Sequence, residues 1–241
     1  MTKNRKQQEI NYLFEGFPFK EKSAYQGTTK DESTCKKNEK YEKPACEKDH
    51  KEDFCCKIKA TCDLEDVRPA VVDLPYPALK VQCQNKYYAK LLTEDFSGVG
   101  SELTAIMQYI NHEIRFTKCY CEISKTLLAI ALAEMDHLQM LGELITLLGA
   151  PLTYDISSEK GCMPWNSDIV FYGTNVVNML ISDLKGEYGA IEQYKSHIKK
   201  IDDPCINAVL SRIIKDEEYH IQLISSLIDN LDCCSLDSCN K

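Results

Sequence analysis

Apolar residues recur at three- and four-residue steps in four stretches of the chain between residues 85 and 231. That period places the apolar side chains on one face of an α-helix, which must then be buried against other helices. Gly98 and Gly100 weaken the first stretch locally, because glycine is a poor helix former. The four predicted helices span residues 85–114, 121–148, 174–200 and 204–231.

The ends of these helices carry their own signals. Gly149 and Pro151 end the second helix, as glycine and then proline commonly do past a helix C-terminus. Thr174 is the expected N-cap of the third helix. Asp203 followed by Pro204 ends the third helix and starts the fourth, with aspartate as N-cap and proline at the first helical position.

One bundle domain is expected between two irregular ends. Residues 149–172 form a long connection, so the helix order is hairpin, long crossover, hairpin. This is the connectivity of ferritin-like bundles, and we predict an all-α, ferritin-like four-helix bundle for residues 83–232. Residues 1–82 form a Cys-rich, largely irregular N-terminal region, of which 67–82 should be an extended lead-in that packs on the bundle. Residues 233–241 form a Cys-containing tail.

The chain repeats one pattern twice within these helices. Residues 102–112 and residues 187–197 share Glu-x2-Ala-Ile-x-Gln-Tyr-x2-His at a constant offset of 85. A Glu-x-x-His follows each copy, 32 residues after the leading glutamate in the first half and 30 residues after it in the second. Two hairpins that each supply one single Glu and one Glu-x-x-His form the ligand set of a dinuclear metal site. The candidate ligands are Glu102, Glu134, His137, Glu187, Glu217 and His220.

Helix geometry brings these six residues to one level of the bundle. A chain that climbs and descends through equal numbers of residues returns to the same height, since each helical residue rises about 1.5 Å. The midpoints between the paired glutamates, residues 118 and 202, fall in the predicted hairpin turns, so each single glutamate should face the Glu-x-x-His of its own hairpin. Four buried carboxylates with two neutral imidazoles carry a charge of −4, which two divalent cations would cancel.

The ligand types narrow the choice of metal. Carboxylate and imidazole suit iron, manganese and, less specifically, zinc, but they do not suit copper(I). We therefore expect two manganese or two iron ions per chain. Ala105 and Ala190, one turn beyond the single glutamates, would leave room for a small oxidant. Tyr109 and Tyr194 could donate hydrogen bonds to bridging carboxylates, or could simply pack in the core.

Other polar residues of the helices are expected to act elsewhere. His112 and His197 belong to the duplicated pattern but lie about 15 Å along the helix from its glutamate. We expect them to make helix-end or interhelical hydrogen bonds rather than to bind metal. Four acidic residues are expected to face water: Asp136, Glu143, Glu192 and Glu218.

The cysteine content is high. Of 13 cysteines, six precede residue 84 and three follow residue 232, and none of these nine forms Cys-x-x-Cys. A zinc ribbon or a rubredoxin-type iron site is therefore not supported. An odd number of cysteines cannot pair completely within one chain. We expect free thiols in a reducing cytosol, and the alternative is cross-linking between chains or metal capture by the Cys-rich ends.

Composition and charge argue against a membrane-spanning, a secreted or a nucleic-acid-binding protein. No apolar run reaches the length of about 18 residues that a membrane span needs. The N-terminal residues hold no apolar stretch typical of a secretory signal, so we expect a cytoplasmic protein. The net charge is −8, and the acidic excess lies in the bundle region, which argues against a nucleic-acid partner.

Four segments resemble the ferritin-like superfamily of rubrerythrins, bacterioferritins and manganese catalases: SELTAIMQYINHE, LAEMDHLQMLGEL, GEYGAIEQY and DEEYHIQL. They look most like the small manganese-catalase-related proteins of anaerobic, often spore-forming bacteria. The resemblance covers residues 83–232 and implies that the six candidate ligands hold two metal ions. It makes Glu134 and Glu217 the bridging candidates. In manganese-catalase-like sites the glutamate at the place of Glu217 can instead act as an acid/base group that does not bind metal.

The leading hypothesis is a dinuclear oxidoreductase that acts on hydrogen peroxide or oxygen, with Glu217, Tyr109 and Tyr194 as catalytic candidates. A rubrerythrin-type peroxidase is less well matched, because rubrerythrins carry a further glutamate where this chain has Ala190, and because the rubredoxin domain is missing. One alternative is an iron oxidation and storage protein. The other is a non-enzymatic spore-coat protein that is cross-linked through cysteines. We expect a homo-oligomer with no nucleic-acid or membrane partner.

Overall fold

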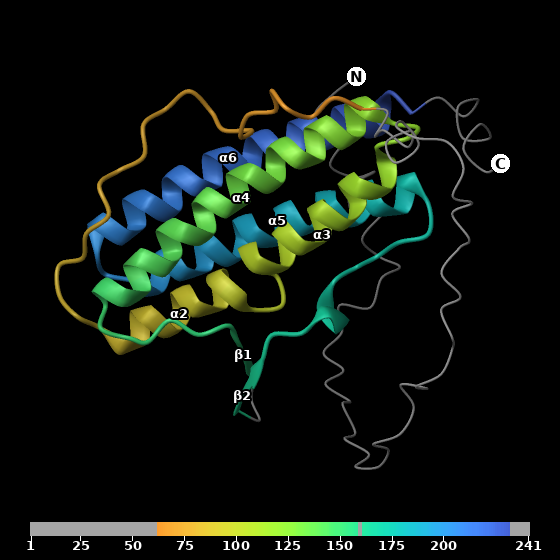
Figure 1. The fold of residues 1–241 in the computed structure, drawn as a ribbon. Helices are drawn as coiled ribbons and strands as arrows, with labels where there is room; N and C mark the ends of the chain where they lie inside the picture. The colour runs from red at the N-terminus through yellow and green to blue at the C-terminus, as the bar shows by residue number, and fades with distance from the viewer. Residues whose placement is uncertain (1–61, 159–160, 232–241) are drawn as a thin grey trace, which may run out of the picture. The chain divides into compact units, whose positions relative to one another are not determined.

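The computed structural model describes residues 62–158 and 161–231. Its helices form a ferritin-like four-helix bundle whose first member is divided in two, as Figure 1 shows. The first hairpin pairs α2 and α3 with α4, and the second pairs α5 with α6. The helix bounds are α2 (Lys86–Ser97), α3 (Glu102–Phe116), α4 (Cys121–Leu147), α5 (Val176–Lys200) and α6 (Pro204–Asp229).

The first bundle member is broken between α2 and α3. The prediction of one continuous helix over 85–114 is wrong at this point. A Cβ atom at Gly98 would lie 2.4 Å from the Glu94 carbonyl oxygen, so the turn accepts only glycine without a shift of the backbone. Ser101 then caps α3, since its hydroxyl accepts the N–H of Thr104. As a result, Glu102 is the first residue of α3 rather than a mid-helix residue.

The other helix ends follow the sequence signals closely. The side chain of Asp203 accepts the N–H groups of Cys205 and Ile206, and Pro204 is the first residue of α6, as predicted. The third helix begins one residue later than expected. Its N-cap is Asn175, which forms a capping box with Asn178, and not Thr174.

The long crossover carries a small β-hairpin that the all-α prediction did not include. Strand β1 (Asp155–Ser158) pairs antiparallel with β2 (Gly161–Pro164), and the 3₁₀ helix η1 (Ser167–Ile169) follows. Trp165 donates a hydrogen bond from its indole nitrogen to the hydroxyl of Thr104 at 3.0 Å. The crossover is thereby tied to the start of α3, close to Glu102.

An extended segment, residues 62–82, runs along α4 and α6 and is called the strap below (Figure 1, orange). The N–H of Ala70 donates to the carbonyl of Ala129 on α4 at 2.8 Å. On α6, Arg212 donates to the carbonyls of Val72 and Leu74 at 2.9 and 2.8 Å. The expected extended lead-in over 67–82 is therefore present and packs on the bundle.

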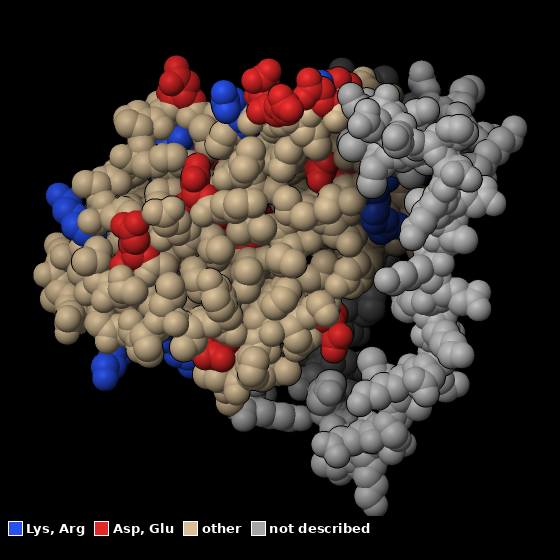
Figure 2. Space-filling view, in the orientation of Figure 1, with Lys and Arg blue, Asp and Glu red and all other residues tan. Residues whose placement is uncertain are grey.

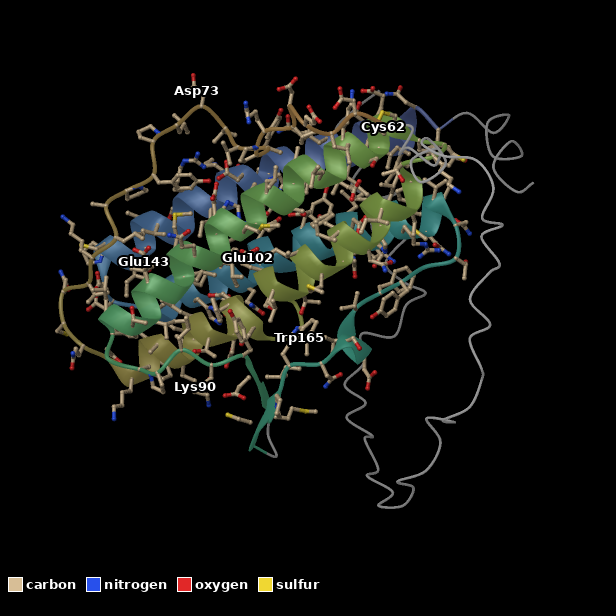
Figure 3. All side chains as sticks on the ribbon, in the orientation of Figure 1. Cys62, Asp73, Lys90, Glu102, Glu143 and Trp165 are labelled. Carbon is tan, nitrogen blue, oxygen red and sulfur yellow. A yellow bond between two sulfur atoms is a disulfide. The ribbon has the colours of Figure 1, made fainter. Side chains whose placement is uncertain are left out.

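Three described cysteines are oxidised, contrary to the expectation of free thiols. A disulfide joins Cys62, at the start of the strap, to Cys121, the first residue of α4 (Figure 3). Cys119 is disulfide-bonded as well. Cys83, Cys162 and Cys205 are free. Of the nine cysteines in the Cys-rich ends, Cys62 and Cys83 are described and the other seven lie outside the described residues, so cross-linking between chains stays a prediction.

The core is divided into two apolar clusters by a layer of polar side chains. One cluster contains Leu92, Leu144 and Leu210, and the other contains Leu127 and Leu180. Along α4 and α6 the Glu-x-x-His motifs fall between the two clusters. The carboxylates of this layer are buried, unlike the acidic side chains visible in Figure 2, several of which gather along its upper edge.

Among the described helices, none combines the length and the apolar character needed to cross a membrane.

Candidate metal centre

All six predicted ligands meet inside the bundle. Every one of them is buried, although they come from four different helices. Two groups of potential ligand atoms form, and the atoms of each group lie within 4.8 Å of one another. The first group is Glu102, Glu134, His137 and Glu217, and the second is Glu134, Glu187, Glu217 and His220. Glu134 and Glu217 belong to both groups, which is the geometry of two carboxylates between two cation positions.

Both histidines direct the same ring atom toward the carboxylates. Nδ1 of His137 lies 2.9 Å from Glu134 and 3.3 Å from Glu217. Nδ1 of His220 lies 3.0 Å from Glu217 and 3.2 Å from Glu134. The glutamate at the start of α3 is 4.0 Å from His137, and Glu187 is 3.5 Å from His220. Each imidazole can therefore ligate through Nδ1.

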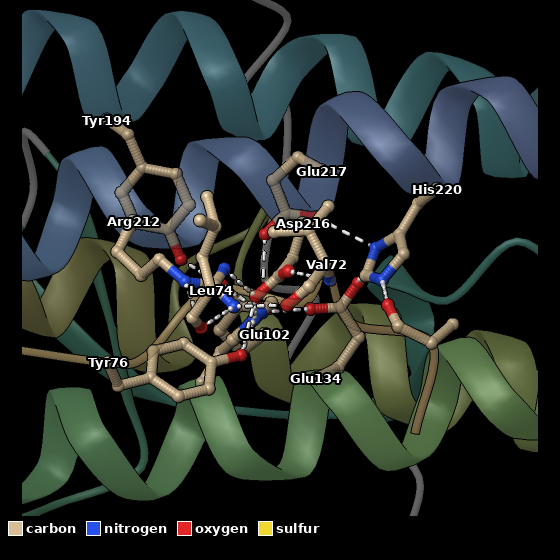
Figure 4. A network of polar contacts seen from close by, with 12 residues as sticks. Val72, Leu74, Tyr76, Glu102, Glu134, Tyr194, Arg212, Asp216, Glu217 and His220 are labelled. Atoms are coloured by element: carbon tan, nitrogen blue, oxygen red, sulfur yellow. Dashed lines mark hydrogen bonds and ion pairs between the residues drawn. The ribbon is translucent and has the colours of Figure 1, made fainter. Parts of the chain in front are cut away.

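The opposite ring atoms are held by groups outside the six (Figure 4). Nε2 of His137 lies 3.1 Å from the carboxylate of Asp216 and 3.4 Å from the hydroxyl of Tyr76. Nε2 of His220 lies 2.8 Å from the carbonyl of Ala70. A proton on Nε2, donated to such an acceptor, leaves Nδ1 free to bind a cation.

Asp216 was missed by the sequence analysis. Its carboxylate is fully buried and contacts the guanidinium of Arg212 at 2.7 Å, the N–H of Val72 at 2.8 Å and the hydroxyl of Tyr76. Burial opposes its ionisation, but these hydrogen bonds and the one from His137 lower the pKa of Asp216 well below its usual range. The signal that could have found it is a charged pair four residues apart on a largely apolar helix.

The pKa values of the six side chains shift so that their charges offset one another. Burial opposes ionisation of Glu134 and Glu217, but hydrogen bonds and the charges of the two imidazoles lower the pKa of both carboxyls. Burial and the neighbouring carboxylates raise the pKa of Glu102 and Glu187 well above the usual range. Despite burial, the surrounding carboxylates raise the pKa of both histidines. The favoured state pairs two carboxylates with two imidazolium ions.

Two tyrosines tie the hairpins together across the site. Tyr109 on α3 donates a hydrogen bond to Glu187, and Tyr194 on α5 donates one to Glu102. Both tyrosines do donate to carboxylates, but the acceptors are the single glutamates and not the bridging candidates that were predicted. Burial and the adjacent glutamate raise the pKa of each tyrosine, which keeps both hydroxyls protonated as donors.

The remaining polar residues lie where the sequence placed them. His112 pairs with Asp183 at 2.9 Å and His197 with Asp95 at 2.8 Å, so both make interhelical contacts away from the six. Ala105 and Ala190 are partly buried against the apolar clusters, and the room for an oxidant beside them stays a prediction. All four residues expected to face water are exposed: Asp136, Glu143, Glu192 and Glu218.

The residues present fit two divalent cations. Oε1 of Glu217 is a buried acceptor that makes no hydrogen bond of good geometry among the described atoms, although Nδ1 of His137 lies 3.3 Å away. It belongs to a residue shared by both ligand groups, and a cation would supply a partner for it. The donor set, four carboxylates and two imidazoles, suits manganese or iron.

Comparisons with known proteins indicate the same fold. The ferritin-like domain model matches residues 97–234. A probable manganese catalase from Clostridium acetobutylicum is 23% identical over 171 residues, which cover 64% of this chain and 75% of that protein. The crystal structure of a manganese catalase from Anabaena PCC7120 superposes with a TM-score of 0.59 at 25% identity, over 66% of this chain and 78% of that one.

A bacterioferritin from Mycobacterium tuberculosis shares the fold, with a TM-score of 0.52 at 24% identity over 61% of this chain and 87% of that chain. The family match covers more than half of the 241 residues and includes all six of the converging side chains. The chain therefore belongs to the ferritin-like domain family.

Proposed function

We propose that this protein is a dinuclear manganese or iron oxidoreductase that acts on hydrogen peroxide or oxygen, with manganese-catalase-type disproportionation of peroxide as the leading reaction. The observation that carries the proposal is the pair of ligand groups that share Glu134 and Glu217. The similarity to proteins described as manganese catalases supports peroxide as the substrate. The proposed ligands are Glu102, Glu134, His137, Glu187, Glu217 and His220.

The proposed roles follow from the positions of the side chains. Glu134 and Glu217 lie between the two cation positions, while the histidines and the single glutamates complete one position each. Two such ions, when bound, supply one-electron redox steps and Lewis acidity. Tyr109 and Tyr194 fix the orientation of the single glutamates through their hydrogen bonds.

Peroxide disproportionation also moves protons from one peroxide to the other. One peroxide is oxidised to O2 and releases two protons and two electrons, and the other takes them up and yields two water molecules. In the alternative in which Glu217 does not bind metal, its buried carboxylate would accept a proton from one peroxide and return it to the other. The two electrons released by one peroxide are the two that the other takes up, so no external electron donor is needed.

Replacement of the shared carboxylates tests this function. We expect Glu134→Gln combined with Glu217→Gln to lower the rate of peroxide turnover by at least about 100-fold, because neutral amides neither cancel the cation charge nor transfer protons. Oxygen evolution from peroxide by the metal-loaded protein is the measurement. Glu143→Gln combined with Glu218→Gln removes two carboxylates from the exposed surface and is the matched control. Unchanged turnover in the first variant would exclude the proposal.

Iron oxidation and storage is a second candidate, since the same side chains and the same fold would serve it. The similarity in fold to a bacterioferritin is the observation in its favour. Light scattering separates the two: a closed particle of many subunits would favour storage, and a monomer or dimer would exclude it. The homo-oligomer, the cytoplasmic location, the alternative spore-coat location and a cross-linked structural role remain predictions.

A further inference from the structure

The strap reaches the outer side of both histidines of the proposed metal centre. The carbonyl of Ala70 accepts from Nε2 of His220, and the hydroxyl of Tyr76 lies 3.4 Å from Nε2 of His137 and contacts Asp216. We propose that the strap is a working part of the metal centre, in which Ala70 and Tyr76 are positioning residues for one histidine each. This inference rests on the proposed function.

The internal duplication explains why an outside segment is needed. The two Glu-x-x-His motifs are related by an offset of 83, so the residue that corresponds to Asp216 in the first motif is Ala133. Asp216 gives His137 a carboxylate acceptor, but the alanine, which is fully buried, can give His220 none. A buried imidazole N–H without an acceptor would be destabilising. The carbonyl of Ala70 fills this place at 2.8 Å.

The strap is fixed where these contacts occur. Ala70 donates its own N–H to Ala129 on α4 at 2.8 Å, which sets the position of its carbonyl. Besides His137, three donors hold Asp216 in place, and two of them, the N–H of Val72 and the hydroxyl of Tyr76, belong to the strap. The guanidinium of Arg212 stacks on the Tyr76 ring at 4.2 Å and also holds two strap carbonyls.

The two cation positions are therefore unequal. A carboxylate acceptor behind His137 makes that imidazole a stronger base than a neutral carbonyl does behind His220. The family match begins at residue 97, after the strap, so these contacts are added to the matched domain from outside it. Changes in the strap should alter one cation position at a time.

The test is a Zn²⁺ titration of the full chain, with each imidazole followed by its ¹⁵N resonances and affinity measured by chelator competition. His137→Gln and His220→Gln assign the signals. Ala70→Pro removes the N–H that fixes the Ala70 carbonyl and should weaken the position of His220 about tenfold. Tyr76→Phe should weaken the position of His137 about tenfold.

Matched controls exist in the same part of the chain. Ala78 also follows a proline in the strap, is exposed and has an N–H with no hydrogen bond among the described residues, so Ala78→Pro should leave both positions unchanged. Tyr87→Phe, at an exposed position of α2, should do the same. Two bound Zn²⁺ with no selective loss in either test variant would overturn the role of the strap alone. No Zn²⁺ bound to the unaltered chain would overturn the metal centre and, with it, the strap's role.

Discussion

The six site residues differ in whether their protonated or deprotonated form is favoured, and this difference affects metal binding. Burial and neighbouring charges favour protonated Glu102 and Glu187 and protonated histidines, while Glu134 and Glu217 are favoured as carboxylates. A cation can bind only to the deprotonated groups. Metal binding must therefore displace protons from the two single glutamates and the two histidines.

Calorimetry should detect this release. Two protons from the single glutamates and two from the histidines give a maximum of four protons for two divalent ions. The raised pKa values mean that protons compete with metal at low pH, so the apparent metal affinity should rise with pH until these groups have lost their protons. Titrations in two buffers of different ionisation enthalpy give the number released. Release of no protons at pH 7 would contradict the described protonation state.

The six site residues could be predicted from spacing alone, because helices rise regularly and a hairpin returns to its starting height. The groups that contact Nε2 of the two histidines could not be predicted in this way. Ala70 and Tyr76 lie in an extended segment, where no period relates sequence position to height along the bundle. Asp216 was not predicted as a buried residue, because an acidic residue beside Glu217 is typical of the charges on a solvated helix face.

The helices agree with the apolar periodicity of the sequence, except where a local backbone contact interrupts the first of them. Apolar periodicity could predict α4, α5 and α6 to within about two residues, which is the usual uncertainty of helix ends. It could not predict the break after α2, since Leu103, Ile106 and Ile110 continue the three- and four-residue steps beyond it. That break depends on the close approach of Gly98 to a backbone carbonyl, and the β-hairpin in the crossover has no strong sequence signal.

A matched pair of glycine substitutions tests the break. Gly98→Ala would place a Cβ atom 2.4 Å from the Glu94 carbonyl oxygen, a backbone atom that cannot move aside easily. We expect the free energy of unfolding to fall by about 1–3 kcal/mol. Gly100→Ala meets no atom within 4 Å and should leave stability unchanged or slightly higher. Urea denaturation of both metal-free variants provides the measurement, and equal midpoints would show that the close approach does not matter.

At the scale of the whole molecule, the strap and the crossover connect the two hairpins from outside. The strap contacts α4 and α6 and is closed at its start by the disulfide between Cys62 and Cys121. The crossover reaches α3 through Trp165 and α2 through Ser97, whose hydroxyl donates to the carbonyl of Asp155 at 2.8 Å. This disulfide could not be predicted from the sequence, because cysteine spacing alone does not reveal pairing.

The disulfide should contribute strongly to stability. It closes a loop with a sequence separation of 59 residues, so its loss frees a large part of the unfolded chain. Cys62→Ala should lower the free energy of unfolding by about 2–4 kcal/mol under non-reducing conditions. Cys83→Ala, at an exposed free thiol, should have no effect. A reductant should abolish most of the difference between Cys62→Ala and the unaltered chain; if the difference persists, the disulfide is not its cause.

The metal content of the purified protein tests the central claim most directly. The protein should be produced with both manganese and iron available and then measured by elemental analysis. The proposed centre predicts about two manganese or two iron ions per chain. Absence of any bound transition metal, even after reconstitution of the metal-free protein, would contradict the metal centre and the function built on it.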